Sequence, residues 1–172
     1  NGRKGGQAMG LLQRYDEILT ALLVGLRAVY GARLVACAVY GSVGRGTPRE
    51  DSDVDLLIVA RDLPVGRVAR VEEFLPVEAR LESMLGAARP GLEVIALSPA
   101  FKTPEELAAG SPLLLDMVED ARLLYDPEGV LRRCLDRLRS RLQELGARRV
   151  PHGGGWYWEL KPDLKPGEVF TL

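Results

Sequence analysis

The stretch that most constrains the fold of this chain is residues 35–60, where a glycine-rich turn joins two apolar segments. The first, Val35–Tyr40, favours a strand and ends at Gly41-Ser42. The second, Val54–Ala60, is typical of a buried strand. Glycines let backbone N–H groups approach an anion closely, and a serine adds a hydroxyl donor beside them. The sequence therefore predicts two strands joined by a turn suited to a phosphate group.

Two carboxylates stand at the start of the second strand. Asp53 and Asp55 are two residues apart, and strand side chains alternate, so both are predicted to point to the same side, about 7 Å apart. Two anions on one face repel each other unless a cation lies between them. A hard divalent ion with oxygen ligands, Mg²⁺ first, is the predicted occupant.

Other binding-site motifs with a similar sequence fit this segment less well. An EF-hand loop starting at Asp51 would need glycine where Leu56 stands and glutamate where Asp62 stands. A phosphate loop of the Walker type would need Gly-Lys-Ser or Gly-Lys-Thr, which the sequence lacks. A phosphoaspartyl hydrolase would carry its aspartates after a strand, whereas these precede one. The order of turn, acid pair and strand is therefore informative.

This order resembles the signature of the minimal nucleotidyltransferases in the DNA polymerase β superfamily. The matching letters are Gly41-Ser42-x-x-Arg45-Gly46 and Ser52-Asp53-x-Asp55-Leu56, and the resemblance spans Arg33 to Leu97. It implies an α/β (α+β) fold, with a small mixed β-sheet and helices on one face. It also implies that Gly41, Ser42, Arg45, Gly46 and Ser52 bind the nucleotide.

The resemblance implies a third carboxylate on a later strand. Glu93 stands inside the apolar run Leu92–Leu97, where an unpaired acid would be costly to bury, and it is the predicted third catalytic and metal-binding residue beside Asp53 and Asp55. The alternative is an exposed strand start at which Glu93 pairs with an arginine. Two Mg²⁺ ions, or Mn²⁺ in their place, would bind this cluster.

By this resemblance the chain is a nucleotidyltransferase that moves a nucleoside monophosphate, AMP from ATP, onto a hydroxyl acceptor. Many minimal relatives are antitoxins that modify a helical HEPN-type partner protein. The alternatives are a module that binds nucleotide or sequesters a partner without transfer, and a nucleotide sensor. The formal net charge of −1 argues against nucleic acid as a partner, whereas a homo-oligomer stays open.

The rest of the chain predicts one domain. Residues 1–10 are expected to be a flexible extension, 11–149 the nucleotidyltransferase domain and 150–172 an extended tail docked on the domain or on a neighbouring subunit. Further elements are predicted as helices at Leu11–Tyr30, at Leu63–Leu85 with a kink or break at Pro76, near Thr103, after Ser111-Pro112 and at Glu128–Leu145, a loop over much of Pro99–Gly110, and an edge strand at Ala121–Tyr125.

A few isolated residues carry weaker signals. Cys37 and Cys134 lie in apolar patterns typical of buried free thiols, and no apolar run is long enough for a membrane span, so a cytoplasmic protein without a membrane partner is expected. In the tail, Trp156 and Trp158 either dock the segment or stack on an adenine base. His152 is expected at the surface. The arginine row of the last helix, Arg133, Arg137 and Arg141, indicates a solvated face or a site for an acidic partner.

Overall fold

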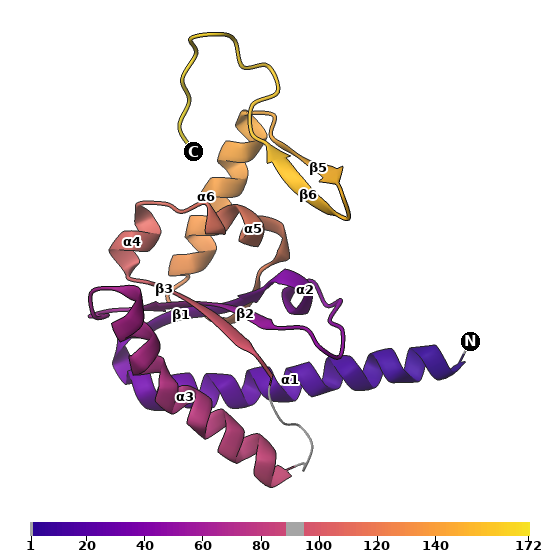
Figure 1. Cartoon of the computed structure of the whole chain (residues 1–172). Coiled ribbons are helices and arrows are strands. Elements are labelled where there is room, and N and C mark those ends of the chain that lie inside the picture. Colours follow the sequence, from indigo (N-terminus) through magenta and orange to yellow (C-terminus); the bar gives the residue numbers. More distant parts are fainter. Residues whose placement is uncertain (1, 89–94) are drawn as a thin grey trace.

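The computed structural model describes residues 2–88 and 95–172, whose helices and strands are arranged as Figure 1 shows. A four-stranded sheet lies between two groups of helices, and a two-stranded hairpin follows near the C-terminus. Along the chain the elements are α1 (Gly2–Tyr30), the 3-10 turn η1 (Gly31–Arg33), β1 (Leu34–Tyr40), α2 (Gly41–Gly44), β2 (Val54–Ala60), α3 (Arg67–Ala88), β3 (Leu97–Lys102), α4 (Pro104–Ala108), α5 (Leu113–Asp120), β4 (Arg122–Tyr125), α6 (Val130–Glu144), β5 (Arg148–His152) and β6 (Gly155–Glu159).

The central sheet is mixed, with the strand order β3-β2-β1-β4. Strand β1 is antiparallel to both β2 and β4, whereas β2 and β3 are parallel. The register places Tyr40 of β1 opposite Asp55 of β2, and Asp55 opposite Ser98 of β3. The predicted α/β fold with a small mixed sheet is therefore confirmed.

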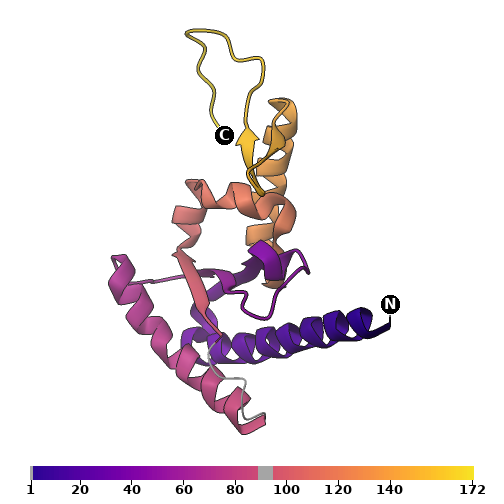
Figure 2. The same cartoon turned by 45° about the vertical axis from the view of Figure 1, so that its right-hand side comes forward.

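Helices cover both faces of the sheet, so the expectation of helices on one face was wrong. Helices α1 and α3 lie on one side, and α4, α5 and α6 lie on the other (Figures 1 and 2). The reason lies in β1 and β2, nearly all of whose residues are buried. Because successive strand side chains point to opposite faces, a strand buried throughout needs apolar cover on both.

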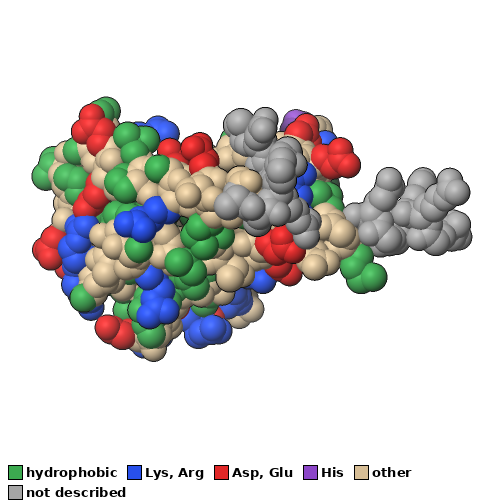
Figure 3. Space-filling view, turned by 90° about the horizontal axis from the view of Figure 1, so that it is seen from below, with side chains coloured by type: hydrophobic (Ala, Val, Ile, Leu, Met, Phe, Trp, Pro, Cys, Tyr) green, Lys and Arg blue, Asp and Glu red, His purple; other side chains and the backbone are tan. Residues whose placement is uncertain are grey.

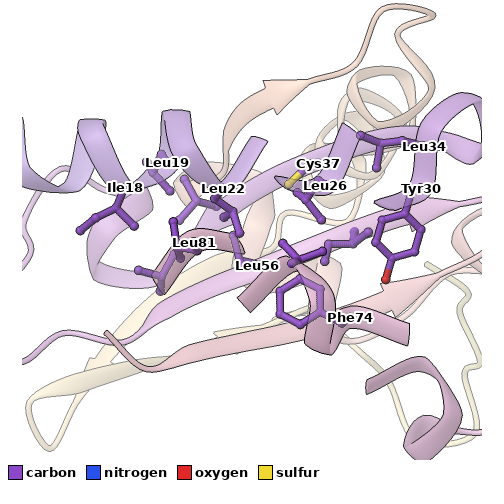
Figure 4. Packing of buried hydrophobic residues seen from close by; sticks show 14 of the residues in the cluster. Ile18, Leu19, Leu22, Leu26, Tyr30, Leu34, Cys37, Leu56, Phe74 and Leu81 are labelled. Atoms are coloured by element: carbon purple, nitrogen blue, oxygen red, sulfur yellow. The ribbon is translucent and has the colours of Figure 1, made fainter. Parts of the chain in front are cut away.

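The two faces have separate cores, between which the residues of β1 and β2 alternate. On the α1 and α3 side, helix residues such as Leu22 and Phe74 pack on Leu56 (Figure 4). On the other side, Leu57 and Val59 pack against residues of α4, α5 and α6. Since Asp55 shares its strand face with Leu57 and Val59, its carboxylate belongs to the α4–α6 side of the sheet.

The outer surface of α1 and α3 mixes charged, polar and apolar side chains (Figure 3). A kink or a break was predicted at Pro76, and the break does not occur, since helix α3 continues through Pro76. Its neighbours Phe74 and Val77 are fully buried and hold the helix on the core. Among residues 2–88 and 95–172, none of the helices combines the length and the apolar character that a membrane crossing requires.

The third strand lies further along the chain than predicted. It spans Leu97–Lys102, where a strand at Leu92–Leu97 followed by a loop was expected, and residues 89–94, including Glu93, lie outside the described residues. The strand was predicted as a loop because it contains Pro99, and proline is typical of loops. Because β3 pairs only with β2 and forms one edge of the sheet, it can accommodate a proline, and Phe101 anchors it in the core.

A flexible N-terminal extension and an extended, docked C-terminal tail were expected, and both ends of the chain contain regular secondary structure. Helix α1 begins at Gly2 instead of Leu11. Near the C-terminus, β5 and β6 pair with each other as an antiparallel hairpin, and Trp158 packs against the core on the α4–α6 side. The remaining chain after Glu159 forms turns without further strands or helices.

Candidate active site

The predicted acid pair lies at the entrance to β2. Asp53 is exposed and directly precedes the strand, while Asp55 is half-buried between Tyr40 and Ser98 in the sheet. Burial raises the pKa of Asp55, the charge of Asp53 raises it further, and the guanidinium of Arg45 opposes both effects. The charge of Asp53 is therefore close enough to disfavour the ionised form of Asp55, as in a site that takes a cation.

The turn after β1 is a single helical turn, α2, and approaches the acid pair very closely. Gly41 has a left-handed φ of +66°, and a Cβ built there would lie 2.3 Å from Oδ2 of Asp55. At Gly44 a Cβ would lie 2.5 Å from the carbonyl oxygen of Asp120 and 2.8 Å from that of Val39. Glycine at these two positions thus allows the turn to sit directly against β2 and α5.

The two halves of the motif are joined by a hydrogen bond between serine hydroxyls. Ser42 Oγ donates to Ser52 Oγ at 3.1 Å, and Ser52 Oγ also accepts from the backbone N–H of Arg49 at 2.8 Å. Between them, Gly46 has φ of +73° and its N–H donates to the carbonyl of Val43 at 3.1 Å. The structure therefore brings Ser42, Ser52 and the aspartates into one site, with Gly46 shaping the loop between them.

Sequence reasoning missed Tyr15 of α1, which holds the loop between α2 and β2. The hydroxyl of Tyr15, on α1, donates to the carbonyl oxygens of Arg49 and Ser52, at 2.9 Å each. Tyr15 was interpreted only as part of an apolar helix stripe. The available signal was its hydroxyl, because a buried tyrosine usually needs a hydrogen-bond partner.

Arg45, the predicted phosphate ligand, donates to Asp120 Oδ2 at 3.0 Å. Asp120 is a buried carboxylate with a side chain only 7% exposed, and Arg149 of β5 donates to both of its oxygens, at 3.3 and 3.2 Å. The guanidinium carbons of Arg45 and Arg149 lie 4.8 and 4.6 Å from the ring centre of Trp156. Asp120, Arg149 and Trp156 thus connect the C-terminal hairpin to the Gly-Ser turn. Docking of the segment was one of the two roles predicted for Trp156, whereas sequence reasoning assigned no role to Asp120 or Arg149.

The remaining candidates are the predicted third metal ligand, the histidine and the two cysteines. Within residues 2–88 and 95–172, no group of three His, Cys, Asp or Glu side chains could hold a metal, so the described carboxylates of the site are Asp53 and Asp55. Glu93 stays a prediction, because it lies outside those residues. His152 is exposed and contacts Tyr157 edge-on, with ring centres 6.1 Å apart. Cys37 and Cys134 are free thiols, the first buried and the second half-buried.

Residues 29–89, which contain the glycine-rich turn and the aspartate pair, match the family model described as "Nucleotidyltransferase domain". The chain is 38% identical over 79 residues to the protein adenylyltransferase MntA of Thermococcus cleftensis, covering 46% of this chain and 73% of that protein. It belongs to the MntA family of minimal nucleotidyltransferases.

Two more proteins are similar to this chain. The putative protein adenylyltransferase MJ1305 of Methanocaldococcus jannaschii is 26% identical over 132 residues, which cover 76% of this chain and 84% of that protein. Among solved structures, a crystal structure of a toxin-antitoxin with AMP-PNP matches with a TM-score of 0.46 and 19% identity, covering 74% of this chain and 92% of that one.

Proposed function

We propose that this chain transfers AMP from ATP to a hydroxyl group of a protein, and that the acceptor is a HEPN-type partner, to which it acts as an antitoxin. The single observation that carries the proposal is the close approach of Gly41 to Asp55, in a turn whose Ser42 is bonded to Ser52 next to Asp53. The relatives named protein adenylyltransferases support AMP as the group and a protein as the acceptor.

The donor set fits Mg²⁺ or Mn²⁺. Asp53 and Asp55 supply carboxylate oxygens, and magnesium is commonly held by one or two carboxylates together with the phosphates of a substrate. Glu93 remains our candidate for a third ligand. When bound, such ions neutralise charge on the triphosphate and lower the pKa of the attacking hydroxyl.

The chain's own residues would then position the reactants. The N–H groups of Gly41 and Ser42 and the Ser42 hydroxyl would hold the phosphates that leave as pyrophosphate, with the positive charge of Arg45 nearby. The acceptor oxygen forms a bond to the α-phosphorus as the bond from that phosphorus to the bridging oxygen breaks. The hydroxyl proton passes to a carboxylate, for which Glu93 is our candidate, and on to water.

The alternative to an enzyme is a binding module, which binds nucleotide or a partner protein without transferring AMP. The half-buried Asp55 beside Asp53 argues against it, because a pure binder gains nothing from holding a carboxylate beside a second one that disfavours its ionised form. The free thiols and the use of ATP favour the cytoplasm as the place of action.

The test combines the chain with a purified HEPN-type protein and ATP labelled at its α-phosphate. We expect label on the partner, lost by at least about 100-fold in Asp53→Asn/Asp55→Asn. The matched control is Asp163→Asn, which changes an exposed aspartate of the C-terminal segment. Calorimetry with a non-hydrolysable ATP analogue, with and without Mg²⁺, separates the two classes: metal-dependent binding by the wild type without label on the partner would favour the module.

A further inference from the structure

Arg45 lies where the Gly-Ser turn meets the C-terminal hairpin, which is on the same side of the sheet as α5 and α6 (Figures 1 and 2). It directly follows α2. Burial and the charge of Asp53 raise the pKa of Asp55, and the charge of Arg45 lowers it. The guanidinium of Arg45 is therefore near the carboxylates of the site as well as near Asp120, to which it donates at 3.0 Å.

Most of the hydrogen-bonding capacity of Arg45 is left for a ligand. A guanidinium has N–H donors arranged in a planar fork. Among residues 2–88 and 95–172, the side chain of Arg45 makes one hydrogen bond, to Asp120, and it is 33% exposed. The remaining N–H groups suit phosphate oxygens, which a guanidinium binds in pairs.

One hydrogen bond does not fix the orientation of a guanidinium, and Asp120 is shared. Nη2 of Arg149 donates to the same oxygen, Oδ2 of Asp120, so two positive groups meet at one carboxylate. The ring centre of Trp156 lies 4.8 Å from the guanidinium carbon of Arg45 and 4.6 Å from that of Arg149. An indole ring attracts a cation over its face and restricts the plane of a guanidinium that lies there. Trp156 thus supplies a second restraint on Arg45.

We propose that Trp156 is a positioning residue, which holds the guanidinium of Arg45 in place for the triphosphate of ATP. The inference rests on the proposed function, in which the Gly-Ser turn and Arg45 receive the phosphates that leave. An arginine that is already aligned loses less freedom when it binds the phosphates, so the ring should tighten ATP binding. The same alignment keeps the positive charge where negative charge develops on the leaving pyrophosphate, so the ring should also raise kcat.

The experiment compares Trp156→Leu, which keeps an apolar side chain without an aromatic face, with Trp156→Phe, which keeps such a face. Tyr157→Leu is the matched control, because it removes an exposed aromatic side chain that points to the other face of the same strand. Each variant should stay folded, because Trp156 is 40% exposed and the hairpin is separate from the central sheet.

Calorimetry with a non-hydrolysable ATP analogue and Mg²⁺ measures the effect on binding. We expect Trp156→Leu to raise Kd by at least about fivefold, with Trp156→Phe and Tyr157→Leu within about twofold of wild type. With α-labelled ATP and the HEPN-type partner, kcat/KM for ATP should fall by at least about fivefold in Trp156→Leu alone.

A double-mutant cycle with Arg45→Gln separates positioning from simple docking of the hairpin. Without the guanidinium the ring has nothing to align, so in that background Trp156→Leu should change Kd by less than about twofold. Equal Kd values for Trp156→Leu and Trp156→Phe would overturn the inference. So would a loss of about fivefold that persists in the Arg45→Gln background.

The outcomes also separate this inference from the proposed function. If the wild type binds the analogue but puts no label on the partner, the proposed function fails, and the comparisons of Kd still decide the role of Trp156. If transfer occurs while Trp156→Leu binds the analogue as wild type does, the role of Trp156 fails alone. If the wild type binds no triphosphate, both fall together.

Discussion

Substitution of Gly41 by alanine tests the contact on which the site depends. The backbone at Gly41 has φ of +66°, a conformation that costs a residue with a Cβ about 1 to 2 kcal/mol. The new methyl group would also lie 2.3 Å from Oδ2 of Asp55, so the carboxylate has to move by about 1 Å. A displacement of that size can lower a rate by about 100-fold.

Gly146→Ala is the matched control. Gly146 follows α6 and has φ of +67°, and no atom lies within 4 Å of the position that a Cβ would take there, so its substitution adds only the backbone strain. We expect strain to cost each variant about 1 to 2 kcal/mol in urea unfolding, and Gly41→Ala to lose more than Gly146→Ala because of its contact with Asp55. Only Gly41→Ala should also lose AMP transfer by about 100-fold.

A double-mutant cycle isolates the steric term. In the background of Asp55→Ala the new methyl group of Gly41→Ala meets no carboxylate, so its cost in unfolding free energy should fall to that of Gly146→Ala. Equal losses of transfer in Gly41→Ala and Gly146→Ala, or an unchanged cost in the Asp55→Ala background, would refute the reasoning.

Three further substitutions test the framework around the site, each by chemical unfolding. Asp120→Asn should lose about 3 kcal/mol, because it leaves two arginines without their buried carboxylate, whereas Glu119→Gln removes one half-exposed ion pair and should lose less than about 1 kcal/mol. The hydrogen bonds from Arg70 lower the pKa of Glu106 to about 2. The stabilisation of the folded chain by this ion pair is therefore present above the ordinary pKa of glutamate and is lost as pH falls towards 2. Because the pair is half-exposed, wild type should be about 1 kcal/mol more stable than Glu106→Gln at pH 7, and the difference should vanish near pH 2. Pro76→Ala should raise stability by about 1 kcal/mol, since the proline is exposed inside α3 and interrupts its hydrogen bonds; a loss would show that the helix needs the proline.

Local patterns predicted much of the fold. Val54–Ala60 is apolar throughout and is bounded by turn residues, so its limits as a strand could be read directly, and the helix expected at Glu128–Leu145 is found at Val130–Glu144 because its leucines recur at helical spacing. The edge strand expected at Ala121–Tyr125 is found at Arg122–Tyr125. These elements depend on neighbouring residues alone.

The errors have a common physical origin in contacts between distant parts of the chain. Strand β3 contains Pro99, which local rules assign to a loop, and only its pairing with β2 makes it a strand. The cover of both sheet faces likewise depends on where α4, α5 and α6 pack, which a local pattern does not encode. Tyr15 and Asp120 were missed because their partners lie 29 to 75 residues away in the sequence.

The chemistry and the support of the site come from different parts of the chain. The region that matches the nucleotidyltransferase domain, residues 29–89, contains the Gly-Ser turn and the acid pair. The loop within it is held by Tyr15 from before that region and by Asp120 from after it, and Asp120 is in turn fixed by Arg149 of the hairpin. Because these supports carry no reacting group but hold the turn against Asp55, activity should respond to changes in α1 and in the C-terminal hairpin as strongly as to changes in the loop itself.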